Sequence, residues 1–359
     1  MIAPPRRAGW WGWLHSELAP YPGREIIALR MVVSVVLVTV ISMALQTPET
    51  AVSAYMVFFV SKENRALTTL TGVVMFIGVT LGVGASLFLC KITFDYPELR
   101  VPLMALTIFA GMFLSRTFAI GPLAFAIGFI VAVTQSMADS VPDGEALARA
   151  FLWAWPFIVF PLALTVIVNQ ILLPNAVVDS GRAHPEKKKH RGLFVPDAFT
   201  NPGHVRFALK VTLAAMTCYI IYMGVDWSGI HTAFITCCFI ALESTAATIH
   251  KGWLRLGGCL VGGLLGFLSI MYLVPHMQSI FSLVLLTAAG AALAAWVAAG
   301  SLRSAYAGLQ IGLAFFMCIF QGFAPDTNFT TIRDRLVGIV LGLVVSSTIF
   351  LYLWPERDV

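Results

Sequence analysis

Carboxylates inside apolar sequence are the first candidates for chemistry in this chain. Glu63 and Glu243 each follow a short apolar stretch, and they coincide when the sequence is shifted by 180 positions. A carboxylate at membrane depth is costly unless it is paired or functional, which makes both residues candidates for carrying protons. The alternative is that each is a loop charge beside the next helix. Both interpretations stay open at this stage.

Three basic side chains form a second group of candidates. Arg30 and Lys210 occupy equivalent places in the first helix of each half. Two such charges predict either contacts with lipid headgroups or a vestibule that attracts organic anions. His231 begins the short apolar segment of the second half, next to Thr232, and the first half has no equivalent. Histidine can exchange protons near neutral pH, whereas the alternative is a hydrogen-bonded residue at the membrane interface.

The remaining candidates also lie in the second half. Arg333 and Arg335 begin the last apolar stretch, and Asp334 between them is expected to neutralise their charge. Gln310 lies inside an apolar helix, where its amide is expected to bond a neighbouring helix or a ligand. No metal-ligand spacing, phosphate-binding loop or nucleophile motif occurs. We therefore predict no metal, no cofactor and no enzymatic activity.

The composition indicates which elements position these residues. Hydrophobic residues make up 58% of the chain and charged residues 11%, whereas soluble domains carry about 25% charge. The apolar runs do not alternate as barrel strands do, so we predict an all-α integral membrane protein. A span needs ~20 apolar residues. About twelve transmembrane helices are expected near residues 26–45, 49–61, 70–91, 100–117, 119–138, 147–173, 205–224, 229–242, 252–274, 279–300, 304–323 and 333–354.

The sequence from Pro202 to Gly266 repeats the sequence that starts at Pro22. This predicts two tandem six-helix repeats, related as parallel repeats about an axis near the membrane normal. Glycines with four-residue spacing recur in both copies and predict close helix packing inside the chain, with contact between subunits as the alternative. These glycines are Gly78, Gly82, Gly258, Gly262 and Gly266.

The second helix of each half is expected to be unusually short. Pro48–Ser61 and Gly229–Leu242 would span ~21 Å of a hydrocarbon core ~30 Å thick. Paired short segments at matching places in two repeats are the best sequence pointer to a transport site. The sequence therefore predicts that both short helices line a pathway.

Basic residues predict the orientation and the division of the chain. Most of the 23 lysines and arginines fall on one side, which places both termini in the cytosol. The net charge of +5 follows this sidedness and does not indicate a nucleic-acid partner. The six cysteines are expected to be small buried hydrophobes. The predicted divisions are an interfacial segment 1–24, repeats 25–174 and 205–355, a basic linker 175–204 and a tail 356–359.

Several motifs resemble one family of membrane proteins. Glu17–Arg24 looks like the N-terminal motif of the fusaric acid resistance (FUSC) and aromatic acid exporter superfamily. Trp227–Thr232, His250–Gly258, Tyr306–Gly312 and Arg333–Leu336 resemble its multidrug efflux (MdtO-type) branch. The resemblance covers about residues 14–355. Relatives of this type usually carry a soluble domain between the halves, where this chain has only the short linker.

The resemblance implies a multi-pass exporter in the inner membrane of a Gram-negative bacterium. It implies aromatic or other organic acids, or amphipathic toxic compounds, as substrates, and export driven by the proton gradient. A periplasmic adaptor, an outer-membrane channel, membrane lipid and a second copy of the chain are the implied partners. We expect alternating access at the repeat interface. A passive organic-anion channel and a membrane scaffold for an adaptor remain the alternatives.

Overall fold

The computed structural model describes residues 17–62, 64–141, 143–172, 192–242, 244–301, 304–321, 324–325 and 330–354. Glu63 and Glu243, most of the predicted linker and the predicted tail lie outside these residues. Within them the regular secondary structure is helical apart from one pair of two-residue strands and an isolated bridge between Phe118 and Phe194. This confirms the predicted all-α fold.

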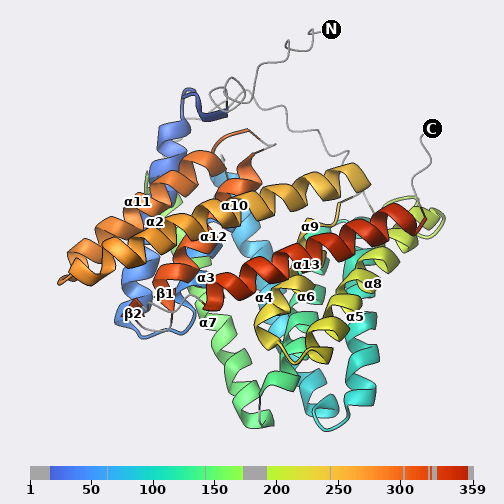
Figure 1. Cartoon of the computed structure of the whole chain (residues 1–359). Helices are drawn as coiled ribbons and strands as arrows, with labels where there is room; N and C mark the ends of the chain where they lie inside the picture. The colour runs from blue at the N-terminus through green and yellow to red at the C-terminus, as the bar shows by residue number, and fades with distance from the viewer. Residues whose placement is uncertain are drawn as a thin grey trace, which may run out of the picture.

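The helices follow the same order in both halves of the chain (Figure 1). The first half forms α2 (Arg24–Ala44), α3 (Thr50–Val60), α4 (Arg65–Thr93), α5 (Pro97–Thr117), α6 (Gly121–Met137), the 3-10 turn η1 (Ala138–Ser140) and α7 (Gly144–Leu172). The second half forms α8 (Pro202–Gly224), η2 (Ser228–His231), α9 (Thr232–Ile240), α10 (Thr245–Tyr272), η3 (Val274–His276), α11 (Ile280–Ala298), α12 (Ala305–Ile319) and α13 (Thr330–Tyr352). Strands β1 (Phe320–Gln321) and β2 (Ala324–Pro325) pair in antiparallel fashion between α12 and α13.

Nine helical segments in the described part of the chain are long and apolar enough to cross a membrane. The two segments predicted to be short are short, since α3 has 11 residues and the second-half equivalent runs from Ser228 to Ile240. A third short helix differs from expectation. α12 ends at Ile319 rather than near residue 323, because the chain leaves the helix there and enters the strand pair. Three short apolar helices therefore lie among the longer ones in the described part of the chain.

Matching residues stabilise the connection between each short helix and the long helix that follows it. Asn64 accepts a hydrogen bond from the backbone of Ala66 and caps α4, and Ser244 caps α10 in the same way through Ala247. A threonine in the first turn of each long helix then forms a hydrogen bond with the backbone of this connection. Thr68 Oγ1 accepts from Lys62 N at 2.9 Å, and Thr248 Oγ1 accepts from Leu242 N at 3.0 Å. The described backbone donors of each connection, on Lys62 and Ala66 and on Leu242 and Ala247, are therefore satisfied locally.

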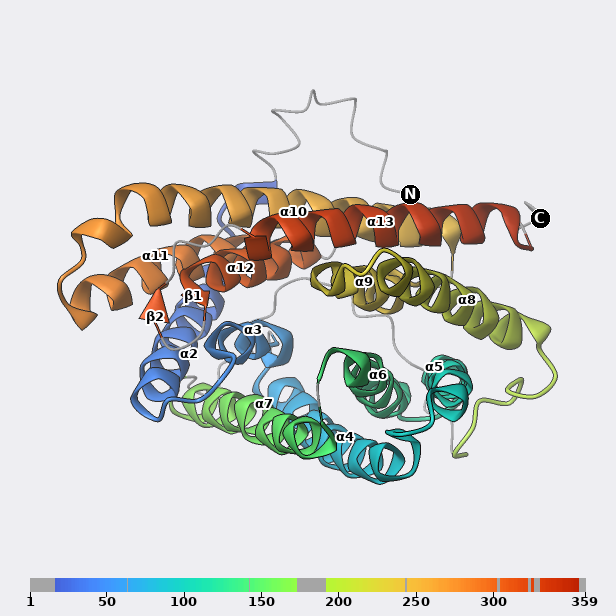
Figure 2. The ribbon, with the colours of Figure 1, turned by 60° about the horizontal axis from the view of Figure 1, so that its bottom comes forward.

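The two halves pack together through the first and fourth helices of each. Helix α2 packs on α11 and α8 packs on α5, so the first helix of each half contacts the fourth helix of the other. In Figure 2 most first-half helices lie below and most second-half helices lie above. In Figure 1 α10 and α13 run across the view whereas α5 and α7 run down it. The relation of the halves as parallel repeats about the membrane normal stays a prediction.

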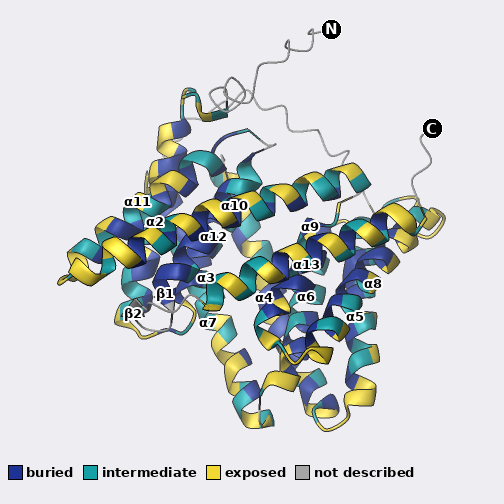
Figure 3. Ribbon diagram, viewed as in Figure 1, coloured by how far each residue is buried: buried dark blue, intermediate teal, exposed yellow. Residues whose placement is uncertain are grey.

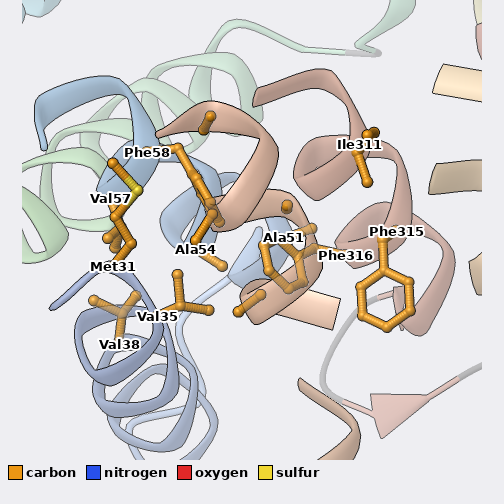
Figure 4. Close-up of a cluster of buried hydrophobic side chains, with 14 of the residues drawn as sticks. Met31, Val35, Val38, Ala51, Ala54, Val57, Phe58, Ile311, Phe315 and Phe316 are labelled. Atoms are coloured by element: carbon orange, nitrogen blue, oxygen red, sulfur yellow. The ribbon is translucent and has the colours of Figure 1, made fainter. Parts of the chain in front are cut away.

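The two largest hydrophobic clusters contain residues from both halves. One core joins α2 and α3 to α11 and α12, and Figure 4 shows Phe58 of α3 close to Phe316 of α12. Their ring centroids are 6.1 Å apart. The other core joins α5 to α8 and α9. A polar link accompanies it, because Asp139 pairs with Arg100 and accepts a 2.6 Å hydrogen bond from Tyr219. The halves therefore form one folding unit.

The recurring glycines lie where helices approach closely. Gly78 and Gly82 of α4 face α6, and Gly258, Gly262 and Gly266 of α10 face α12. A Cβ atom on Gly258 would lie 2.6 Å from a carbonyl oxygen of α12, so only glycine permits this approach. The outer faces of α10 and α13 carry exposed leucines and valines (Figure 3), as expected of surfaces in contact with lipid.

Candidate functional site

A buried arginine lies at the centre of the candidate site. Arg255 is in the third turn of α10 and its side chain is 2% exposed. Its Nε donates to Thr236 Oγ1 of α9 at 3.2 Å. Its Nη1 donates to the hydroxyl of Tyr306 at 3.1 Å and to Oε1 of Gln310 at 3.2 Å, both on α12. The guanidinium thereby joins the short helix α9 to the short helix α12.

Tyr55 from the first half of the chain and Lys251, a second cation, also belong to this cluster. Tyr55 of α3 is 6% exposed and close enough to Arg255, Tyr306 and Arg335 to interact with their charges or hydroxyls. Lys251 lies one turn before Arg255 on α10, with Nζ 4.9 Å from the centre of the Tyr306 ring. All three short helices therefore contribute a polar side chain to one cluster.

Arg335 extends the cluster toward α13. Its Nη1 lies 2.8 Å from the sulfur of Met317, and its Nε is buried without a hydrogen-bond partner. The side chain lines a small pocket of about 10 Å³, room for about one water molecule, together with Cys259 and Ala314. The Nε2 of Gln310 is also buried without a partner. The cluster thus holds two donor groups that could still bind an acceptor.

The cluster is positive and has no counter-ion within the described residues. Each carboxylate ion pair there involves other side chains, and none of them joins Lys251, Arg255 or Arg335. An uncompensated charge in the interior costs several kcal/mol. Intramembrane charges of this kind are functional candidates by default. The donors, cations and tyrosine hydroxyls here can bind a carboxylate or another small anion.

Arg30 and Lys210 lie apart from this cluster and at equivalent places in their halves. Arg30 is 2% exposed, donates to the side chain of Asn169 on α7 and has Nη2 3.4 Å from the carbonyl oxygen of Lys62. Lys210 is 6% exposed and donates to the carbonyl oxygen of Trp354 at 3.0 Å, beyond the end of α13. Both charges thus bind near the ends of helices, where exposed carbonyl dipoles favour cations.

Of the three predicted proton carriers, the structure describes only His231. Glu63 and Glu243 lie outside the described residues. His231 is exposed, and its Nδ1 lies 3.0 Å from the carbonyl oxygen of Ser228. Its ring is close enough to Arg335 to interact with that charge. Thr232 is buried, and its carbonyl oxygen accepts the hydroxyl of Thr236.

Asp334 pairs with one of the two arginines that flank it. Arg333 Nε donates to Asp334 Oδ1 at 2.8 Å, and the guanidinium lies 5.3 Å from the Trp227 ring centre. The Asp334 carboxylate packs directly on Gly229, so a Cβ at that position would overlap it. Arg335 has no bond to Asp334. The structure therefore separates the two arginines, one at the surface and one in the cluster.

Sequence reasoning included Gln310 and Arg335 but not Arg255, Lys251, Tyr306 or Tyr55. In the sequence Lys251 precedes the predicted span 252–274 and Arg255 lies in its first turn, so both look like basic residues at the membrane surface. α10 instead begins at Thr245 and encloses them. One signal in the sequence does identify Arg255. It precedes Gly258 by three positions and Gly262 by seven, so it shares the glycine face that contacts α12.

Comparison with known proteins gives matches for the second half of the chain. Residues 213–349 match the family described as Fusaric acid resistance protein-like. Multidrug resistance protein MdtO from Shigella flexneri and from Escherichia coli O157:H7 are each 39% identical over 165 residues. MdtO from Escherichia coli strain K12 is 39% identical over 163 residues. No solved structure gives a significant match.

These alignments cover 45–46% of this chain but only 24% of each MdtO protein. The chain therefore matches about a quarter of the length of these relatives. The matched family region contains Arg255, Tyr306, Gln310 and Arg335, whereas Tyr55 lies outside it. The second half of the chain is therefore similar to the fusaric acid resistance protein-like family and to the MdtO multidrug resistance proteins.

Proposed function

We propose that this chain is an inner-membrane exporter of organic anions or amphipathic toxic compounds, and that the Arg255 cluster binds the anionic group of the cargo. The supporting observation is the buried positive charge without a carboxylate partner in the described structure. A carboxylate cargo would supply the missing acceptor through charge-assisted hydrogen bonds. The names of the MdtO relatives are consistent with an efflux role.

All but one of the polar side chains in the cluster come from the second half, which supports a single cargo site. In the first half the positions equivalent to Arg255, Tyr306 and Gln310 are Met75, Pro122 and Ala126, because the glycines of α4 and α10 face α6 and α12 in the same register. These residues cannot bind an anion. Tyr55 is the first-half contribution, and it comes from the short helix α3. A site assembled across both halves is the arrangement that alternating access at their interface requires.

Proton coupling is the second part of the proposal. Among the residues that the structure describes, His231 is the candidate for carrying the proton. It is exposed, near Arg335 and able to change charge near neutral pH. Protonation of His231 and binding of an anion near Arg335 would favour each other electrostatically. Glu63 and Glu243 remain candidates on the grounds of sequence alone. We place both termini in the cytosol, as the distribution of basic residues predicts.

Counterflow in proteoliposomes tests the function directly. Vesicles loaded with an unlabelled aromatic acid should accumulate the labelled acid transiently, and uptake should differ between two pH values if protons are coupled. Flux that ignores a collapsed pH gradient and follows only voltage and substrate gradient would favour a passive anion channel instead. Absence of any counterflow, together with normal drug resistance in cells, would favour a scaffold.

The scaffold alternative also predicts which variants matter. If the chain only holds a periplasmic adaptor and an outer-membrane channel in place, alanine at Arg30, Lys210 or His231 should leave drug resistance unchanged. An exporter predicts loss of resistance for at least one of these variants at normal membrane abundance. Measuring resistance and abundance together separates these outcomes, because a misfolded variant lowers both.

A further inference from the structure

Two cysteines of the second half lie against each other between α8 and α9. The sulfur atoms of Cys218 and Cys237 are 3.5 Å apart, and both side chains are at most 1% exposed. Both are free thiols. A disulfide would need a separation of about 2.05 Å. Two thiolates on one tetrahedral zinc, with Zn–S of about 2.3 Å, lie about 3.8 Å apart. The observed spacing is thus close to that of two ligands on one soft atom.

The surroundings of the pair favour a ligand that needs two thiols and no more. The described residues contain no group of three or more His, Cys, Asp or Glu side chains that could hold a metal ion. The hydroxyl of Ser346 on α13 lies beside Cys237, is buried and has no hydrogen-bond partner of ordinary geometry. The carbonyl oxygen of Gly342 lies 3.7 Å from Cys237 Sγ. Two sulfurs and one unpartnered hydroxyl suit a small thiophilic centre that brings its own third substituent.

We propose that Cys218 and Cys237 form a dithiol site for trivalent organic arsenicals, which bridges α8 and α9. An oxide of the type R–As=O would form two As–S bonds and lose its oxygen. The two thiol protons leave with that oxygen as one water molecule. Arsenic stays trivalent, so the step needs no oxidant or reductant. Cys238 is adjacent in sequence, but it is not part of the contact between the two sulfurs.

Bridging these thiols would fix the short helix that holds the candidate cargo site. Thr236 precedes Cys237 on α9 and accepts the hydrogen bond from Arg255 Nε at 3.2 Å. A covalent link to α8 prevents α9 from moving relative to the first helix of its half. The binding part of this inference is independent of the proposed function. Only the expected inhibition of transport rests on it.

Uptake of phenylarsine oxide by the purified full-length protein tests the site. After incubation under native conditions, intact mass should rise by one bridging phenylarsenic group, and the denatured protein should contain two fewer reactive thiols. Excess dithiothreitol should reverse the change, whereas a monothiol at the same concentration should not. Cys218→Ala and Cys237→Ala should weaken binding by about 100-fold or more, because the second As–S bond is then lost.

Matched variants keep the test decisive. Cys90→Ala and Cys318→Ala remove equally buried thiols elsewhere and should bind like the unmodified protein. Undiminished uptake by Cys218→Ala, or no uptake by the unmodified folded protein, would overturn the proposal. Thermal unfolding of each variant checks that it is folded. Arg255→Met should lose transport but still bind the arsenical, so failure of the transport proposal and failure of this one can be told apart.

Discussion

Replacing Arg255 with methionine separates a functional charge from a structural one. Methionine keeps an unbranched apolar side chain and removes the guanidinium. The exchange removes three hydrogen bonds, to Thr236, Tyr306 and Gln310, each worth about 1.5–3 kcal/mol when charged. It also removes the cost of burying a charge without a counter-ion. Replacing buried ionic groups with apolar ones is often neutral or stabilising by about 1–4 kcal/mol.

These opposing terms predict little change in stability but a large loss of transport. The midpoint of thermal unfolding of Arg255→Met should shift by at most a few degrees. Loss of a charge-assisted hydrogen bond of about 1.5–3 kcal/mol to a bound carboxylate corresponds to roughly 10- to 150-fold weaker binding. Counterflow of a labelled aromatic acid should therefore require a 10- to 150-fold higher substrate concentration. An uncharged substrate should be less affected.

The control is an arginine that has a partner and is exposed. Arg149 pairs with Glu145 at 2.6 Å and its side chain is 70% exposed, so Arg149→Met should change neither stability nor transport. Normal counterflow in Arg255→Met would refute the assignment of Arg255 to the cargo site. A fall in unfolding temperature of ten degrees or more would instead show that the charge serves the fold.

Three further substitutions test the packing and the polar links. Tyr306→Phe removes the hydroxyl that the guanidinium bonds, and the substrate concentration for half-maximal counterflow should rise about 3- to 10-fold without loss of stability. Gly262→Ala places a Cβ against the backbone of α12 and should destabilise the protein by about 1–3 kcal/mol in thermal unfolding. Gly257→Ala, on the same helix with open space around it, should not. Asp139→Asn leaves buried Arg100 without a charged partner and should cost about 1–3 kcal/mol; an unchanged unfolding temperature would contradict this.

The sequence alone determined the helices, the two short second helices and the glycine faces. These features depend on residues close together in the chain. Hydrophobic length decides whether a segment can span a membrane, and small residues four positions apart lie on one helical face. Gln310 could be identified as a candidate because a polar group inside an apolar helix is unusual wherever that helix packs, and Arg335 because it begins an apolar stretch beside a carboxylate.

The tertiary structure decided which helices pair and which charges are buried. Apolar faces are chemically alike, so nothing local predicts that α2 packs on α11 and α8 on α5. The same holds for the distant residues that complete the cluster. Tyr55 and Arg255 are 200 positions apart in the sequence, and only the packing of α3 against α12 brings their elements together. A basic residue near a predicted helix end looks solvated in sequence, but the packing of α10 against α9 and α12 buries Arg255 instead.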